Sequence, residues 1–194
     1  MKSLKIKIKG FTMIELLIVI AVLGVLAVAV LSAINPIEQI NRGRDTGSRS
    51  DAEQLLSAID RYNASHNMWP WQDGPGDSAA VPFTPITETD PKGGTCSMLK
   101  NLGKDTEDTN CPGSDELKSS FIERIINPKT NALYIEYGGM PGDSVYVCFN
   151  PQSGSFTTEA AKRCEDTTNT LPAKACGECP VDSLGKGVNC SCLP

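Results

Sequence analysis

An apolar run near the amino terminus constrains this chain more than any other feature of its sequence. From Phe11 to Ile34 the only charged residue is Glu15. At a rise of about 1.5 Å per residue, a helix of this length can cross the roughly 30 Å core of a bilayer. Four lysines precede the run, whereas the arginines after it are mixed with acids, which favours a cytoplasmic amino terminus. The sequence therefore predicts one membrane-spanning helix with the rest of the chain outside the cytoplasm.

Glu15 is an unusual residue for a helix that serves only as an anchor. A carboxylate in hydrocarbon costs roughly 2.5 to 3.5 kcal/mol on insertion scales, so Leu or Val would anchor better. Two simple interpretations are a secretory signal cleaved near the small residues Ala27, Ala29 and Ala33, and a plain single-pass anchor. Neither interpretation explains the glutamate.

The cysteine content indicates the compartment of the remaining chain. All eight cysteines lie in the second half of the sequence or at its edge. An even number of cysteines in a chain with an export signal favours disulfides made in an oxidising compartment. The formal net charge is −5 although the first ten residues hold four lysines and no acid. So acidic a remainder argues against a nucleic-acid partner.

The start of the apolar run has the distinctive order KGFTMIELLIVIAVLGVLA. This order resembles the class III leader of type IV pilins and type II secretion pseudopilins, in which a short basic leader ends in Gly and the apolar run stays in the mature protein. The resemblance implies that a membrane prepilin peptidase cleaves between Gly10 and Phe11. The same enzyme would then methylate the new amine of Phe11.

Cleavage after Gly10 would give Glu15 a physical role. The new positive amine lies four residues before Glu15, and in a stack of helices the amine of one subunit can approach the carboxylate of its neighbour. Such a pair offsets the desolvation of the acid and favours the stagger in which the two groups align. We therefore expect Glu15 to direct assembly.

A second helix, the stem, is expected over residues 35–68. Its apolar residues recur at helical spacing, at Ala52, Leu55, Leu56, Ile59 and Tyr62. Pro36 disfavours helical geometry at the residue before it, and Gly43 and Gly47 weaken the next turns, so a bend or melted segment is expected between residues 35 and 48. The family resemblance extends through the stem, to about residue 70, on Asn35, Pro36, Arg42, Arg44, Asp45, Ser50, Asp51 and Tyr62.

Residues 69–194 are expected to form a globular extracytoplasmic domain with a cysteine-rich tail at 176–194. The patterns predict a short helix at 115–126 and strands at 131–139 and 143–150, the second strand forming a hairpin with 155–160. A long amino-terminal helix packed on a small antiparallel sheet is an α+β architecture. The chain would then consist of a leader at 1–10, a membrane and assembly helix at 11–34, the stem and this domain.

The cysteines are disulfide candidates with more than one possible pairing. Sequence spacing suggests Cys96 with Cys111 and Cys148 with Cys164, each worth around 3 kcal/mol in the chain-entropy model. Eight cysteines nevertheless allow 105 pairings. In the tail, two disulfides are favoured over a tetrahedral zinc site, because one cysteine pair has a single intervening residue where zinc ribbons have two. The tail cysteines are Cys176, Cys179, Cys190 and Cys192.

Other candidate sites have simple explanations. The acidic loops at 73–77 and 105–110 fit no defined calcium loop, so we expect solvated acids and neither metal nor cofactor. His66, the only histidine, is expected to pack at a helix end because no nucleophile and base accompany it. Trp69 and Trp71 could form an exposed adhesive patch, but we expect them to pack on the core.

Together these features favour a structural subunit of a type IV pilus-like filament, and not an enzyme. Such a homo-oligomeric subunit would be a single-pass membrane precursor, cleaved after Gly10, polymerised through its amino-terminal helix and displayed in a pilus or on the cell surface. Its partners would be the prepilin peptidase and the pilus or secretion machinery of the membrane. Two alternatives are a pseudopilin of a type II secretion or DNA-uptake system, and a bitopic binding module that never polymerises. The sequence does not separate a major from a minor subunit.

Overall fold

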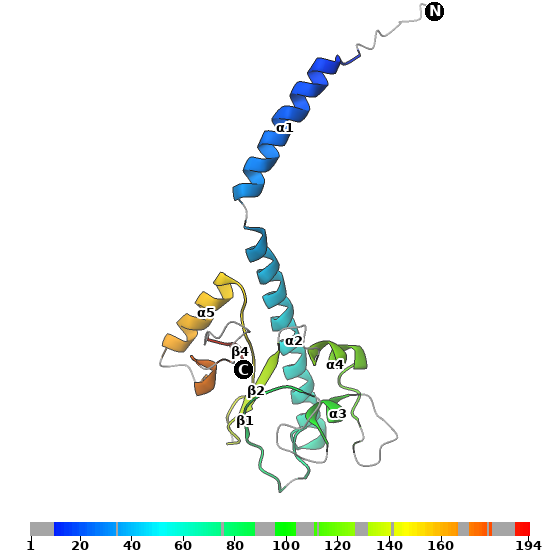
Figure 1. The fold of residues 1–194 in the computed structure, drawn as a ribbon. Coiled ribbons are helices and arrows are strands. Elements are labelled where there is room, and N and C mark those ends of the chain that lie inside the picture. The colour runs from blue at the N-terminus through cyan, green and yellow to red at the C-terminus, as the bar shows by residue number, and fades with distance from the viewer. Residues whose placement is uncertain are drawn as a thin grey trace, which may run out of the picture. The chain divides into compact units, whose positions relative to one another are not determined.

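The chain forms an amino-terminal unit, Met1–Gln39, and a larger unit, Ile40–Pro194. The structure is a computed structural model that describes residues 10–33, 35–74, 76–87, 96–103, 111, 113–126, 132–140, 142–166, 171–177, 179 and 189–194. Residues 1–9 of the expected leader lie outside the described residues. Figure 1 shows the helices and strands in chain order.

Helix α1, Met13–Ala33, is the main element of the amino-terminal unit. Glu15 is its only charged residue, and its large apolar side chains are all at least 50% exposed. A helix that is apolar on all sides needs an apolar environment, such as lipid or other helices. Among the described residues, α1 is the one helix whose length and composition suit a membrane crossing, over Met13–Ser32.

Helix α2, Pro36–His66, is more regular than the sequence predicted. Pro36 lies in the first turn, where a missing N–H costs little, and Asn35 Oδ1 accepts the backbone N–H of Glu38 (3.4 Å). The helix then continues through Gly43 and Gly47. The expected bend or melted segment is therefore wrong from Pro36 onward. Hydrogen bonds to a distant loop, described below, offset the intrinsic cost of the glycines.

The second half of α2 is the spine of the larger unit. The helix ends where Asn67 adopts a left-handed conformation (φ 54°) and donates its N–H to Asn63 O. The predicted apolar stripe is confirmed, and two polar residues extend it toward the amino terminus of the helix. The buried residues of α2 are Asp45, Ser48, Ala52, Leu55, Leu56, Ala58, Ile59 and Tyr62.

The described strands form one antiparallel sheet in the order β1-β2-β3-β4. The strands are β1 (Val81–Pro85), β2 (Leu133–Tyr137), β3 (Tyr146–Phe149) and β4 (Ser191–Leu193). The predicted strands at 131–139 and 143–150 are confirmed as β2 and β3, whereas β1 and β4 were not predicted from the sequence. The α+β fold class is confirmed.

Both faces of the sheet are covered. On one face, Leu133, Ile135 and Tyr137 of β2 join α2 in the main core. On the other face, Tyr134 packs with Cys148 and with the cysteines of the tail. Because alternate residues of a strand point to opposite faces, β2 is apolar at nearly every position. The tail is therefore a second layer of the fold.

Short helices surround this sheet. They are α3 (Met98–Leu102), α4 (Ser119–Ile125), α5 (Gly154–Glu165) and the 3₁₀ helix η1 (Ala173–Ala175). In Figure 1, α3 and α4 lie on one side of α2, and α5 lies on the other. The helix predicted at 115–126 is confirmed in shorter form as α4.

Helix α5 corrects one prediction. Residues 155–160, expected as the partner strand of β3, are helical, and β3 pairs with β4 instead. Ser153 starts the helix by accepting the N–H of Phe156 on its hydroxyl oxygen (3.4 Å). The side chains of Thr157 and Thr158 donate to the carbonyl oxygens of Ser153 and Gly154, which suits these β-branched residues to a helix.

Both outer strands of the sheet have protected edges. Strand β1 contains Pro82 and Pro85, which lack the N–H that a further strand would need. At β4, the Nη1–H of Arg163 in α5 donates to the backbone oxygen of Cys192. Edges closed in this way disfavour pairing with a strand of another chain.

Candidate functional site

The predicted assembly residue meets Thr12 at the start of α1. Thr12 donates its backbone N–H (2.8 Å) and its hydroxyl (2.8 Å) to Glu15 Oε2, and the N–H of Glu15 donates to Thr12 Oγ1 (3.3 Å). This reciprocal arrangement is a capping box, which satisfies N–H groups that have no partner at a helix start. Gly10 and Phe11 precede it outside the helix, and Phe11 is 83% exposed.

Thr12 is a functional candidate that the sequence analysis missed. The sequence did contain the pattern that predicts this role. In a capping box, a Thr is followed three residues later by a Glu, just before an apolar run. The carboxylate of Glu15 is thus hydrogen-bonded within its own chain. Both bonds from Thr12 reach Oε2, and Oε1 has no hydrogen bond in the part of the chain that the structure describes.

A second polar cluster joins the stem to α5. Asp45 is fully buried, and its carboxylate accepts the N–H of Gln152 (2.9 and 3.1 Å to its two oxygens), the N–H of Ser153 (2.8 Å) and the Ser153 hydroxyl (2.6 Å). The start of a helix suits a carboxylate, because free N–H groups and the helix dipole point toward it. Asn41 Nδ2 adds a bond to Gln152 O (3.2 Å), and Arg44 Nη1 donates to Gln152 Oε1 (3.4 Å).

Two ion pairs hold α2 to the segment around α4. Arg124 contacts Asp51 (2.6 Å), and Arg61 contacts Glu116 (2.6 Å). Partial burial raises the pKa of the Asp51 carboxyl, and the charge of Arg124 counteracts part of this rise. These pairs border an open polar groove of about 590 Å³. The groove is lined by Ser50, Glu53, Gln54, Ser57, Arg61, Glu116, Leu117, Lys118, Ser120, Phe121 and Arg124.

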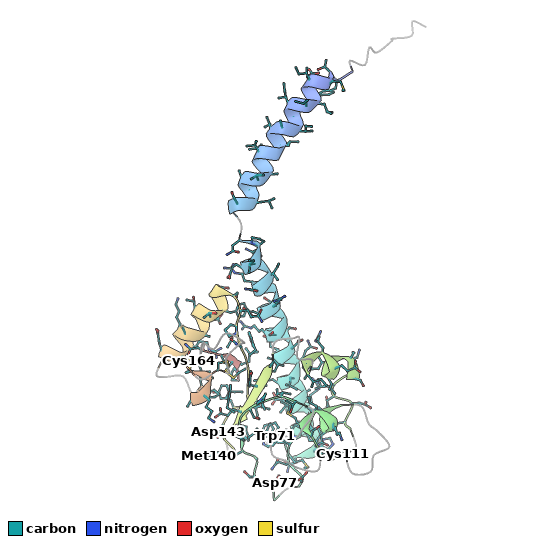
Figure 2. The ribbon with its side chains drawn as sticks, viewed as in Figure 1. Trp71, Asp77, Cys111, Met140, Asp143 and Cys164 are labelled. Atoms are coloured by element: carbon teal, nitrogen blue, oxygen red, sulfur yellow. A yellow bond between two sulfur atoms is a disulfide. The ribbon has the colours of Figure 1, made fainter. Side chains whose placement is uncertain are left out.

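Glu136 lies on the face of the sheet that the tail covers. Burial raises the pKa of its carboxyl, and Lys174 of η1 lowers it in part. Its Oε2 is buried without a hydrogen-bond partner among the described residues. Nearby, in the turn between β2 and β3, Asp143 Oδ2 accepts the N–H of Met140 (3.0 Å), and Figure 2 labels both residues. Glu136 therefore carries an electrostatic cost in the folded state.

All eight cysteines are paired. The bond between Cys96 and Cys111 is confirmed, but Cys148 bonds to Cys192 and not to Cys164. The reason lies in the sheet, where β4 brings Cys192 directly opposite Cys148 of β3. The remaining bonds are Cys164–Cys176 and Cys179–Cys190.

The expected pair of disulfides within the tail is therefore wrong, because only one bond lies inside it. The zinc alternative is also excluded by these bonds, since a bonded cysteine is no thiolate ligand. Within the described ranges, no group of His, Cys, Asp or Glu is placed to hold a metal ion. The acidic loop at 105–110 lies outside those ranges.

The aromatic candidates pack as expected. The ring of His66 stacks on Tyr62 at the end of α2, with 4.2 Å between the centroids. Trp71, labelled in Figure 2, is 1% exposed and donates Nε1–H to Ala79 O. Trp69 stacks on Trp71, with 5.3 Å between the ring centroids. In the other acidic loop, the N–H of Asp77 donates to Gly74 O (3.0 Å). None of these residues forms a catalytic group.

The start of the chain matches a known sequence motif. The family model described as "Prokaryotic N-terminal methylation motif" matches residues 5–31. This segment contains Gly10, Phe11 and the capping box of Thr12 and Glu15.

Similarity to known proteins extends beyond this motif. The chain is 29% identical over 165 residues to "Fimbrial protein" of Neisseria meningitidis serogroup B, which covers 85% of this chain and 84% of the relative. It is 31% identical over 96 residues to "Type IV major pilin protein PilE" of Neisseria gonorrhoeae, covering 48% of this chain and 56% of the relative. No solved structure matches the chain significantly.

Proposed function

We propose that this chain, which the comparisons support as a member of the type IV pilin family, is a structural subunit of a pilus-like filament. It is made as a membrane precursor with its amino terminus in the cytoplasm and its larger unit outside. A prepilin peptidase cleaves after Gly10 and methylates Phe11. The mature chain then polymerises through residues 11–34, with the stem at 35–68 and the globular domain at 69–194 following.

The exposure of α1 is the observation that carries this proposal. All large apolar side chains from Phe11 to Leu31 are at least 50% exposed, and α1 buries none of the residues of its span. Full burial of one Val, Leu or Ile side chain is worth about 1.5 to 3 kcal/mol, so this surface must be covered. Lipid covers it in the precursor, and helices of other subunits can cover it in a filament.

The capping box supports a specific step from membrane to filament. In a single subunit, Thr12 hydrogen-bonds Oε2 of Glu15, which lowers the cost of keeping a carboxylate at the membrane edge. Cleavage creates an amine at Phe11, and the ammonium group of a neighbouring subunit can bind the other oxygen, Oε1. The pair forms only when the two helices have the correct stagger.

The closed sheet edges support polymerisation through helices. The prolines of β1 and the contact of Arg163 with β4 disfavour strand pairing between copies. The hypothesis of a pilus subunit is preferred to that of a pseudopilin because the relatives are named as fimbrial and major pilin proteins. The assembly machinery of the membrane would then be that of a pilus.

Mass spectrometry of the mature amino terminus tests this proposal. A chain that begins with N-methylated Phe11, together with surface filaments that disappear when the gene is deleted, is the expected result. A mature chain that retains Met1 or starts near Ala33 would contradict it. Correct cleavage without filaments would instead favour the pseudopilin alternative.

A further inference from the structure

One disulfide of the larger unit skips several cysteines. Cys148 bonds to Cys192 across a sequence separation of 44 residues, and four cysteines lie between them. Each of the other bonds joins cysteines that are consecutive in the sequence, and two of them are nested inside the long loop. The nested bonds are Cys164–Cys176 and Cys179–Cys190.

The first competitor for Cys148 is Cys164, which follows it by only sixteen residues. The entropic free energy of closing a flexible loop grows as about three halves of RT times the logarithm of its length. In the unfolded chain, closure of the loop from Cys148 to Cys164 is therefore favoured about fivefold over closure of the loop from Cys148 to Cys192. During export from the amino terminus, Cys164 also emerges before Cys192, which follows it in the sequence. A bond between Cys148 and Cys164 prevents two native disulfides, Cys148–Cys192 and Cys164–Cys176.

Such an error must be corrected before the fold closes. Cys148 and Cys192 are 0% and 1% exposed in the native structure, where they face the second layer with Tyr134 and Ala175. Strand β4 reaches its register only when Cys192 lies opposite Cys148. Disulfide exchange needs a thiolate to reach the sulfur atom, so a closed native fold protects the correct bond.

We propose that this chain is a substrate of a thiol–disulfide isomerase, in addition to a disulfide-donating oxidase. The inference rests on the proposed function only in placing the larger unit outside the cytoplasm, where disulfides are made. The isomerase recognises an unfolded chain with the incorrect Cys148–Cys164 bond, and its product is the bond that joins β3 to β4.

The exchange of disulfide partners is itself redox-neutral, and the oxidase named above supplies the one oxidation that follows it. A thiolate of the isomerase attacks the Cys148 sulfur, the bond to Cys164 breaks, and Cys164 leaves as a thiolate. The thiolate of Cys192 then attacks Cys148 in this mixed disulfide and releases the isomerase thiolate. Cys164 and Cys176 finally give two electrons and two protons to the disulfide of the oxidase, which becomes a dithiol.

Oxidative refolding of the full-length chain in detergent tests the inference. The reduced, denatured chain is diluted into a glutathione buffer with or without protein disulfide isomerase, and free thiols are alkylated at intervals before peptide mapping by mass spectrometry. Among early species we expect about fivefold more Cys148–Cys164 than Cys148–Cys192 bonds. The isomerase should then speed the appearance of the Cys148–Cys192 bond. Early formation of that bond, or an equal rate with and without isomerase, would overturn the inference.

Two double variants provide a matched comparison. Cys164→Ser with Cys176→Ser removes one native bond and the main competitor of Cys192, so the acceleration by isomerase should fall. Cys179→Ser with Cys190→Ser also removes one native bond but leaves the competitor, so the acceleration should persist; equal behaviour of the two variants would contradict the inference. The mapped bond is the readout, so poor stability of a variant does not obscure the result. Neither cleavage nor polymerisation is needed, which separates this test from that of the proposed function.

Discussion

Ser153 donates both its backbone N–H (2.8 Å) and its hydroxyl (2.6 Å) to one oxygen of Asp45, whose side chain is completely buried. The two residues belong to segments 108 positions apart in the sequence, and their bonds hold the start of α5 against α2. Hydrogen bonds to a charged acceptor contribute about 1.5 to 3 kcal/mol each, more than neutral ones. The pair is therefore a main tether of the larger unit.

Replacement of Asp45 by alanine should destabilise the larger unit by about 2 to 4 kcal/mol, because three donors lose their acceptor in a buried place. Urea unfolding of the disulfide-bonded chain in detergent, followed by tryptophan fluorescence, measures this loss. Asp60→Ala is the matched control, since Asp60 is exposed on the same helix, and its effect should remain within about 0.5 kcal/mol. Equal effects of the two substitutions would contradict the proposed tether.

Substitution of Glu15 by leucine should leave membrane insertion and leader cleavage intact but abolish filaments, because the Phe11 amine of a neighbour would lose its partner. Electron microscopy and the mass of the mature amino terminus provide the two readouts. Glu15→Gln separates charge from capping: it can still accept hydrogen bonds from Thr12 but cannot form an ion pair, so filaments should again be lost. Abundant normal filaments from Glu15→Leu would refute the assembly role.

Replacement of Glu136 by glutamine should change the pH dependence of stability. The folded state raises the pKa of the Glu136 carboxyl. The stabilisation that follows from this higher pKa is fully present below the ordinary glutamate pKa of about 4.3. It is lost as the pH rises through the higher pKa of the folded state. The melting temperature of the variant relative to the parent should therefore increase between pH 4 and pH 7. Glu159→Gln, on the exposed surface of α5, is the control and should show no such trend. A difference in melting temperature between Glu136→Gln and the parent that stays constant with pH would contradict this role of Glu136.

The long disulfide should contribute more to stability than a short nested one. In the chain-entropy model, Cys148–Cys192 is worth about 4 kcal/mol and Cys164–Cys176 about 3 kcal/mol, given their separations of 44 and 12 residues. Paired serine variants compared by chemical denaturation test this order. A larger loss from the Cys164 and Cys176 variant would show that native packing, and not loop length, sets the contribution.

The amino-terminal features were predictable because their signals are local. The apolar run, the order Gly10-Phe11 and the position of Glu15 all lie within one short stretch of sequence. The stripe of α2 and strands β2 and β3 likewise follow from periodicity. The capping box of Thr12 was equally readable from its spacing.

The missed features depend on contacts between distant residues. Strand β4 has only three residues and shows no periodic pattern, so its place beside β3 could not be read from the tail. The segment at 155–160 has strand-like threonines, but Ser153 starts it as a helix and Asp45 holds that start from 108 residues away. The same distant contacts keep α2 helical through Gly43 and Gly47, where local propensity predicted a bend.

The protected edges of the sheet have a consequence for how such a subunit is stored. Under the proposed function, precursors accumulate in a bilayer, where confinement to two dimensions raises the frequency of encounters between identical chains. Exposed strand edges would then allow cross-β aggregation before any ordered growth begins. With Pro82 and Pro85 on one edge and Arg163 on the other, the sheets of neighbouring precursors can collide without joining. The precursors in the bilayer therefore remain available for assembly, and the filament grows only where their amino-terminal helices align.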